Sequence, residues 1–168
     1  MTITLAPLHD ELLDGWIAAN EESRGETHTT RLLRFWQEML EGKRLILTAW
    51  EGDKFIGHIT LQHVSHYPAF RKAGIPEIVD VWVQPEARRK GAGQKLLDAA
   101  ITAAKKYQAL AIGMGVGVTQ EYGSAHILYG KNGFAPDGSG LWVMGRRAEE
   151  FDEVILSPEA ILMWVKNL

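Results

Sequence analysis

The sequence predicts a mixed α/β domain in which helices cover both faces of one strongly twisted sheet of six or seven strands. Two strand-like runs, 45–50 and 55–64, are joined by a connection that contains Gly and Asp, which predicts an antiparallel hairpin. A run at 77–83, an amphipathic stretch at 94–107 and a run at 110–118 predict a strand–helix–strand unit. The sheet should therefore be mostly antiparallel, with parallel pairing around its central strand.

The remaining elements are predicted from periodicity and from turn residues. Residues 2–8 alternate weakly and end at Pro7, as in a short edge strand. Thr29 or Thr30 is suited to cap the second helix, and Gly42 to end it. In chain order, the other expected elements are a helix over 9–20 that breaks at Gly25, a helix after residue 29, a Pro- and Gly-containing loop at 67–76, a short helix at 121–130, and strands at 141–146 and 160–165.

Composition limits the class of protein. The chain has 168 residues, of which 46% are hydrophobic and 23% charged, as in a globular protein, so we expect a single domain over residues 1–168. It has no cysteine, which excludes thiolate zinc sites, disulfides and cysteine nucleophiles. A net charge of −3 gives no general attraction to nucleic acid. Without a signal-like N-terminus or a long apolar run, we expect a cytoplasmic protein with no membrane partner.

The most informative stretch is Arg88-Arg89-Lys90-Gly91-Ala92-Gly93, between the strand that ends at Val83 and the following helix. Glycines let backbone N–H groups approach a ligand closely, and a helix N-terminus presents unpaired donors and partial positive charge. Three adjacent cations add attraction for more than one negative charge, as in a pyrophosphate. The stretch indicates an anion site, and the alternative is a solvated basic turn.

Two motifs together resemble those of the GNAT acetyltransferase superfamily. Arg88-x-x-Gly91-x-Gly93 after a strand resembles its coenzyme A loop, and Ala125-x-x-Leu128-Tyr129-x-x-x-Gly133-Phe134 resembles its later signature. Their order and spacing also agree, over residues 77–134. The resemblance implies a single N-acetyltransferase domain that uses acetyl-coenzyme A without a metal. The amine would attack the thioester directly in a ternary complex.

The resemblance also implies where the cofactor lies. The pyrophosphate would bind the backbone amides of residues 89–93, and the pantetheine arm would run beside the central strand, where neighbouring strands diverge. A backbone N–H near Val83 would polarise the thioester carbonyl. The implied cofactor-binding residues are Val81, Trp82, Val83, Arg88, Arg89, Lys90, Gly91, Ala92 and Gly93.

Three residues are candidates for proton transfer. An alkylammonium has a pKa of roughly 10, so the acceptor amine must lose a proton before it attacks. Glu77 matches a position from which relatives supply the base. Asp80 is the second candidate for the base, and a chain of water molecules is the third. Side chains alternate along a strand, so Glu77 and Asp80 face opposite ways unless a bulge intervenes. Tyr129 matches the family's general acid, which protonates the departing thiolate.

Some signals leave alternatives open. Many relatives have Asn where this chain has Tyr122, which puts one side-chain contact to the cofactor arm in doubt. Gly113, Gly115 and Gly117 lack the dinucleotide spacing and indicate close backbone approach, which the cofactor arm could supply. We expect the acceptor to be a small-molecule amine. The alternatives are a peptide or protein acceptor and a non-catalytic module that binds acyl-coenzyme A. A homodimer is also open.

Overall fold

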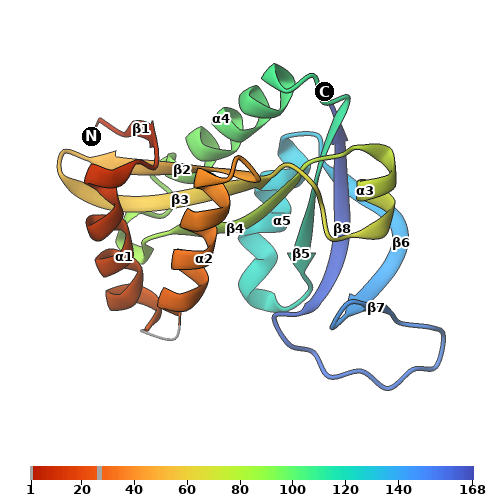
Figure 1. Ribbon diagram of the computed structural model, residues 1–168. Coiled ribbons are helices and arrows are strands. Elements are labelled where there is room, and N and C mark those ends of the chain that lie inside the picture. The colour runs from red at the N-terminus through yellow and green to blue at the C-terminus, as the bar shows by residue number, and fades with distance from the viewer. Residues whose placement is uncertain (1, 26–27) are drawn as a thin grey trace.

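A computed structural model describes residues 2–25 and 28–168. Its described strands form one sheet of eight strands in the order β1-β2-β3-β4-β5-β8-β6-β7. Helices lie on both sides of this sheet, with α1 and α2 together over the N-terminal half (Figure 1). The mixed α/β architecture with helices on both faces is therefore confirmed, and the sheet has one or two strands more than the sequence predicted.

The elements have the following bounds. The strands are β1 (Thr4–Pro7), β2 (Arg44–Glu51), β3 (Lys54–Gln62), β4 (Glu77–Val83), β5 (Ala111–Gly117), β6 (Ala135–Val143), β7 (Arg146–Arg147) and β8 (Ala160–Asn167). The helices are α1 (Asp10–Arg24), α2 (Thr29–Leu40), α3 (Pro68–Ala73), α4 (Ala92–Lys106) and α5 (Gly123–Lys131), with short 3-10 turns at Pro85–Ala87 and Gln120–Tyr122.

Strand pairing follows the predicted pattern. β2 and β3 form the antiparallel hairpin, and β3 pairs antiparallel with β4. β4 and β5, joined through α4, are the parallel pair. Beyond them, β5, β8, β6 and β7 pair antiparallel. Parallel pairing at the centre is thus confirmed, and it follows from the helical crossover that α4 provides.

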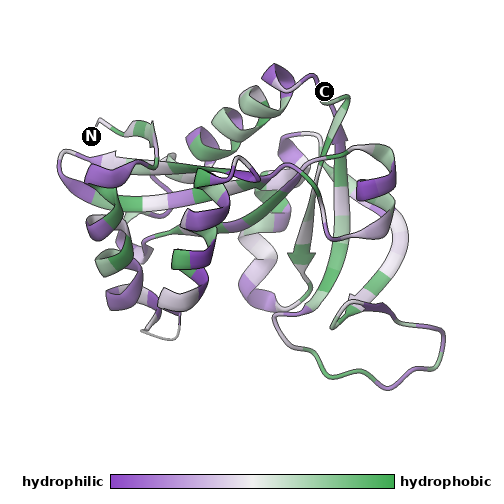
Figure 2. Ribbon diagram, in the orientation of Figure 1, coloured by the Kyte–Doolittle hydropathy of each residue, from purple (hydrophilic) through white to green (hydrophobic). Residues whose placement is uncertain are grey.

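Two apolar clusters hold the layers together. The larger one includes Leu96, Ala100 and other small or branched residues of α4, packed on Ile59 and Ile78 of the sheet. The smaller one, around Trp16 of α1, lies on the opposite face. Green apolar and purple polar residues alternate along α1 and α2 in Figure 2, and apolar residues of both helices belong to this smaller cluster. Because both faces are covered, polar groups of the central strands are buried and need partners.

Three local expectations were wrong. Residues 68–73 form a helix, α3, because Pro68 occupies its first turn and Gly74 ends it in the left-handed conformation (φ 66°). The predicted loop at 67–76 therefore contains a helical turn. β6 begins six residues earlier than predicted, since Gly138 and Gly140 (φ 83° and 84°) fit an irregular pairing with β8. His28, and not a threonine, precedes α2.

Candidate active site

The central strands separate soon after they meet. β4 and β5 pair only at Glu77 with Gly113 and at Ile78 with Met114. β4 continues to Val83 and β5 to Gly117 without further pairing between them. One edge of β4 is therefore unpaired with β5 over most of its length, at the place where the resemblance implied that neighbouring strands diverge.

The open edge presents hydrogen-bond donors. The N–H of Gln84, just past β4, donates to the carbonyl of Ile56 on the β3 side at 2.9 Å. Because successive N–H groups of a strand point to opposite sides, those of Val83 and Val81 point away from β3, into the gap between β4 and β5. These are the strand groups that the family resemblance implies for the pantetheine arm and the thioester carbonyl.

The loop at the end of β4 presents unpaired amides. Arg89 and Gly91 have positive φ (60° and 93°), and Gly91 directly precedes α4. Among the described residues, none accepts a hydrogen bond from the backbone N–H groups of residues 89–93. Successive N–H groups in such a conformation form a concave anion site, which the positive end of the α4 dipole reinforces. The residues present therefore fit a pyrophosphate.

Arg88 ties this loop to the open edge. Its Nε donates to the carbonyl of Val83 at 3.0 Å, and its guanidinium lies 5.0 Å from the ring centroid of Trp82. The Arg88 side chain thus donates to the Val83 carbonyl, which points into the gap between β4 and β5, and places a positive charge beside this gap. Among the nine implied cofactor residues, this contact joins the strand residues 81–83 to the loop residues 88–93.

Helix α5 lies next to the same loop. Gln94 in the first turn of α4 and Asn132 after α5 exchange side-chain hydrogen bonds of 2.8 and 2.9 Å. A Cβ at Gly93 would lie 3.6 Å from Leu128 of α5. Tyr129, the next residue, is buried, and burial raises the pKa of its phenol to about 12, with a smaller contribution from Tyr122. Its hydroxyl therefore stays protonated at neutral pH, as a general acid requires.

A bulge in β4 decides which way the carboxylates face. Between the pairs His58–Trp82 and Thr60–Val79, β4 has one residue more than β3, and Asp80 there has φ 51°. The bulge brings the Asp80 side chain onto the face where His58 lies. Glu77 pairs with Gln62, which shares that face with His58 by strand alternation. Both carboxylates therefore face the α1–α2 side, the case that the sequence analysis made conditional on a bulge.

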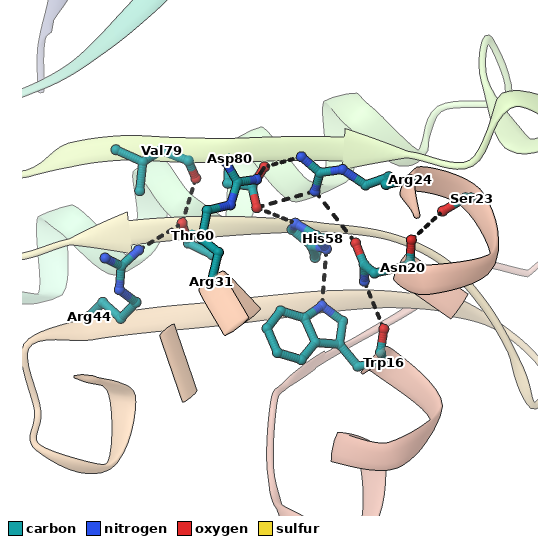
Figure 3. A network of polar contacts seen from close by, with 10 residues as sticks. All are labelled: Trp16, Asn20, Ser23, Arg24, Arg31, Arg44, His58, Thr60, Val79 and Asp80. Carbon is teal, nitrogen blue, oxygen red and sulfur yellow. Dashed lines mark hydrogen bonds and ion pairs between the residues drawn. The ribbon is translucent and has the colours of Figure 1, made fainter. Parts of the chain in front are cut away.

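Asp80 is the centre of a buried polar network (Figure 3). Its Oδ1 accepts a hydrogen bond from Nη2 of Arg24 at 2.9 Å and lies 2.9 Å from Nη2 of Arg31. Its Oδ2 contacts Nη1 of Arg24 at 3.3 Å and Nε2 of His58 at 3.2 Å. The Asp80 side chain is only 7% exposed, so these partners replace water almost completely.

Trp16 orients the imidazole ring of His58. The indole N–H of Trp16 can only donate, and it donates to Nδ1 of His58 at 3.0 Å. Nδ1 must therefore carry no proton, and Nε2–H donates to Asp80. His58 therefore links Trp16 to Asp80 and positions the Asp80 carboxylate.

The two carboxyl groups differ in proton affinity. Burial alone would raise the pKa of Asp80, but the hydrogen bond from His58 and the charge of Arg24 outweigh it, so the pKa lies well below its ordinary range. For Glu77, burial raises the pKa, and the hydrogen bond from Ser65 opposes it only in part. Ser65 Oγ donates to Oε2 of Glu77 at 2.6 Å. Glu77 is thus the carboxyl group whose proton affinity is closer to that of a base acting near neutral pH.

Replacing Asp80 by Asn should cost about 3–5 kcal/mol of unfolding free energy, because the nearly covered guanidinium of Arg24 and the partly exposed one of Arg31 lose their counter-charge. Denaturant unfolding at pH 7 checks this, with exposed Asp14→Asn as the matched control. The lowered pKa also sets the pH dependence. The stabilisation by Asp80 is complete above the ordinary carboxyl pKa of about 3.9 and decreases as the pH falls toward the folded value. An unchanged unfolding free energy for Asp80→Asn would contradict this role.

Side chains of the protein explain the glycines of β5. A Cβ at Gly113 would lie 2.1 Å from the ring of Phe70, and one at Gly117 would lie 2.4 Å from the ring of Tyr122. Gly115 is similarly crowded, by Ile161 at 2.8 Å. The close approach that the sequence indicated is therefore real, but protein side chains and not the cofactor arm make it. Tyr122, the departure from the family pattern, packs its ring on the end of β5.

Sequence reasoning missed several residues of this site. Arg24, Arg31 and His58 come from α1, α2 and β3, and only the tertiary structure brings them to Asp80 (Figure 3). The sequence signal that could have indicated them was the presence of a histidine and two arginines in elements otherwise predicted to pack on the sheet. Tyr67, Phe70 and Trp142 form an aromatic cluster, in which the rings of Phe70 and Trp142 lie 4.8 and 5.1 Å from that of Tyr67.

Two further features of the described residues concern metal binding and membrane insertion. Within residues 2–25 and 28–168, no three His, Cys, Asp or Glu side chains gather closely enough to hold a metal ion. In the same part of the chain, no helix is both long and apolar enough to cross a membrane.

An unpaired edge of the central strand, a loop of unpaired amides at its end and a buried tyrosine on the neighbouring helix are the features expected of an acyl-coenzyme A-dependent transferase. The model of the acetyltransferase (GNAT) family matches residues 7–134, so the chain belongs to this family. It is an acetyl-coenzyme A-dependent N-acetyltransferase. No curated protein matches it.

Solved structures of the same fold are distant in sequence. PaiA N-acetyltransferase from Thermoplasma acidophilum, in complex with coenzyme A, is 19% identical over 100% of both chains, with a TM-score of 0.65. Ribosomal-protein-alanine N-acetyltransferase from Brucella melitensis is 17% identical over 98% of this chain and 99% of its own, with a TM-score of 0.71. An N-acetyltransferase from Staphylococcus aureus Mu50 is 18% identical over 100% and 98%, with a TM-score of 0.70. At these identities, the likeness shows the shared fold.

Proposed function

We propose that this chain transfers the acetyl group of acetyl-coenzyme A to the primary amine of a small molecule, by direct attack in a ternary complex. One observation carries the proposal. The unpaired amides of residues 89–93 lie at the end of the strand whose open edge points Val81 and Val83 N–H groups into the gap beside β5. The thioester of acetyl-coenzyme A supplies an activated acyl carbon when bound.

Residues of the chain would supply the remaining chemistry. Glu77 accepts the proton of the acceptor ammonium, directly or through water, since its raised pKa brings its basicity closer to neutral pH. A β4 N–H at the gap, from Val81 or Val83, polarises the carbonyl. Tyr129 Oη holds the proton that the departing thiolate needs. Asp80 is engaged by its arginines and His58, so it holds the bulge and does not take up the proton.

A small acceptor fits the surroundings of Glu77 better than a peptide does. A peptide would need an open groove at residues 67–76. In the structure, Phe70 of α3 packs directly on Gly113, the partner of Glu77. Tyr67 also donates to Asp137 Oδ2 at 2.9 Å, which links this segment to β6. These contacts close the side on which a long peptide would lie.

Amine-dependent release of coenzyme A thiol tests the function. A broad panel of primary amines with saturating acetyl-coenzyme A should give steady release with at least one of them. Cofactor binding by calorimetry without release for any amine would instead favour the non-catalytic module. Release only with N-terminal peptides would favour a protein acceptor.

Tyr129→Phe should lower kcat by roughly 10²-fold while leaving the affinity for coenzyme A nearly unchanged, because only the proton donor is lost. The ring keeps its contact with Phe134, whose centroid is 6.1 Å away, so the fold should persist. Steady-state kinetics and calorimetry measure the two quantities. Tyr107→Phe, at the 56% exposed end of α4, is the matched control. An unaltered kcat would remove Tyr129 from the mechanism.

A further inference from the structure

Gly115 is exposed although it lies in the middle of β5, a strand in the interior of the sheet. The N–H of Gly113 donates to the carbonyl of Pro76, just before β4, at 3.0 Å. Because backbone groups two residues apart in a strand point to the same side, those of Gly115 also point toward β4, beyond the last β4–β5 pair. Gly115 therefore lies where the gap between β4 and β5 begins.

One aromatic ring lies on each side of Gly115 along β5. A Cβ at Gly113 would lie 2.1 Å from the ring of Phe70, and one at Gly117 would lie 2.4 Å from the ring of Tyr122. By strand alternation, all three glycines present the same face of the sheet. The exposed backbone of Gly115 is thus bordered by rings from α3 and from the turn before α5.

The same face continues across the sheet to Trp142. Gly117 pairs with Ile161 of β8, and Ile161 pairs with Trp142 of β6, so these residues form a row on one face. The ring of Tyr67 lies 5.1 Å from that of Trp142 and 4.8 Å from that of Phe70. The segment that begins α3 therefore closes the row on one side. We call the resulting set of rings the aromatic frame: Tyr67, Phe70, Tyr122 and Trp142.

The polar ends of two members of the aromatic frame are already engaged. Tyr67 Oη donates to Asp137 Oδ2, and Trp142 Nε1 donates to Ser139 Oγ, both at 2.9 Å. Tyr67, Tyr122 and Trp142 are only half-buried, so part of their ring surface is accessible. The aromatic frame therefore offers a ligand ring and aliphatic surface more than it offers charge.

Glu77 relates the aromatic frame to the reaction. It pairs with Gly113 and shares its face, and Gly115 lies two residues further along β5, roughly 7 Å away. A water molecule can carry a proton over this distance. Ile161 is a diagonal neighbour of Gly115, at roughly 7–8 Å, and its Cδ1 would lie 2.8 Å from a Cβ at Gly115. An amine and a ring separated by about two to four carbon atoms span the distance from Gly115 to Ile161.

We propose that the acceptor is an arylalkylamine whose amine enters the gap beside Gly115. Its aromatic ring lies on Ile161, between the rings of Tyr122 and Trp142. This inference rests on the proposed function. The strands that bear the two ends of this row are separated by one strand, roughly 10 Å in all, which admits one planar ring between two side chains. Aromatic pairs contribute beyond the area that they bury, so a saturated ring should give the poorer acceptor.

The group transfer is the one already proposed. The amine nitrogen bonds to the acetyl carbon as the carbon–sulfur bond breaks. The proton of the amine passes to Glu77, through water, and the thiolate takes the proton of Tyr129. The products are the N-acetylated arylalkylamine and coenzyme A.

Matched amines test this inference. Phenylethylamine, phenylpropylamine and phenylbutylamine are each compared with the cyclohexyl analogue of the same chain length. The two measurements are amine-dependent thiol release and calorimetric binding to the protein saturated with coenzyme A. We expect the best aryl amine to exceed its cyclohexyl analogue about tenfold in kcat/KM, because it contacts two aromatic rings.

Variants of the aromatic frame test where the ring lies. In Trp142→Leu the ratio of aryl to cyclohexyl amine should decrease at least about threefold, mainly through KM, and Trp142→Phe should restore part of it. Tyr122→Leu changes a different element and should lower the same ratio. Thermal unfolding shows that each variant is folded.

Trp50→Leu is the matched control. Like Trp142, Trp50 is half-buried and donates its indole N–H to a hydroxyl, that of Thr48, at 2.8 Å. Its ring also packs edge-to-face, on Phe55 at 5.5 Å. Trp50 belongs to β2, near the other end of the sheet, so its variant should keep the wild-type ratio.

Each alternative outcome has a distinct meaning. Cyclohexyl amines that react as well as aryl amines, or a ratio that either folded Leu variant leaves unchanged, would overturn the inference while the acetyltransferase function stands. A loss of coenzyme A affinity in Tyr122→Leu with an unchanged ratio would assign Tyr122 to the cofactor and also overturn it. If no amine reacts, the proposed function fails. Calorimetry then still decides the inference, since aryl amines that bind no more tightly than their cyclohexyl analogues would contradict it.

Discussion

Glu77→Gln is expected to lower kcat/KM by about 10²- to 10⁴-fold, the range over which general bases contribute. Gln cannot accept the proton of the acceptor ammonium, although its carbonyl can still accept the hydrogen bond of Ser65. The fold should tolerate the change, because a buried carboxylate with a raised pKa costs stability when it ionises. Steady-state kinetics and thermal unfolding measure both effects, with exposed Glu11→Gln as the control.

The pH profile separates this role from a structural one. The base must be ionised, so kcat/KM of the wild type should fall as the pH decreases through the pKa of Glu77, which burial holds above its ordinary value of about 4.3. In Glu77→Gln, kcat/KM should no longer show this decrease at low pH. A variant that keeps both the wild-type rate and this decrease would show that water or another group is the base.

Gly91→Val is expected to weaken coenzyme A binding by at least about tenfold. Gly91 has φ 93°, a conformation that costs a residue with a Cβ roughly 1–2 kcal/mol, and a branched side chain would also cover the amides that precede α4. In the protein itself a Cβ at Gly91 would meet nothing within 4 Å. The substitution should therefore lower the affinity for coenzyme A, which calorimetry measures.

Gly42→Val supplies the matched control. Gly42 also has positive φ (71°) and open space around its Cβ position, but it follows α2, away from the loop. The two variants should lose similar stability, and only Gly91→Val should lose affinity. Equal affinities would mean that the pyrophosphate does not bind at residues 89–93.

Local patterns were sufficient for most elements of the fold. The bounds of β4 agree with the predicted strand, because its β-branched residues favour extended backbone and Pro85 stops it at the C-terminal end. The α4 pattern and the hairpin were equally clear. α3 was missed because Pro and Gly mark loops and short helix ends alike. The irregular pairing of β6 depends on β8, which lies more than fifteen residues further along the chain.

For the site, the sequence by itself determined the loop at 88–93 and its glycines, because helix starts and glycine conformations are local properties. It also singled out Glu77, Asp80 and Tyr129 as candidates, through the resemblance to a family. Only the tertiary structure decided which carboxylate is free. The β4 bulge turns Asp80 toward arginines and a histidine from three other elements, whereas Glu77 is left with Ser65. Proton affinity depends on burial and on neighbouring charges, and neighbours distant in sequence are fixed by packing.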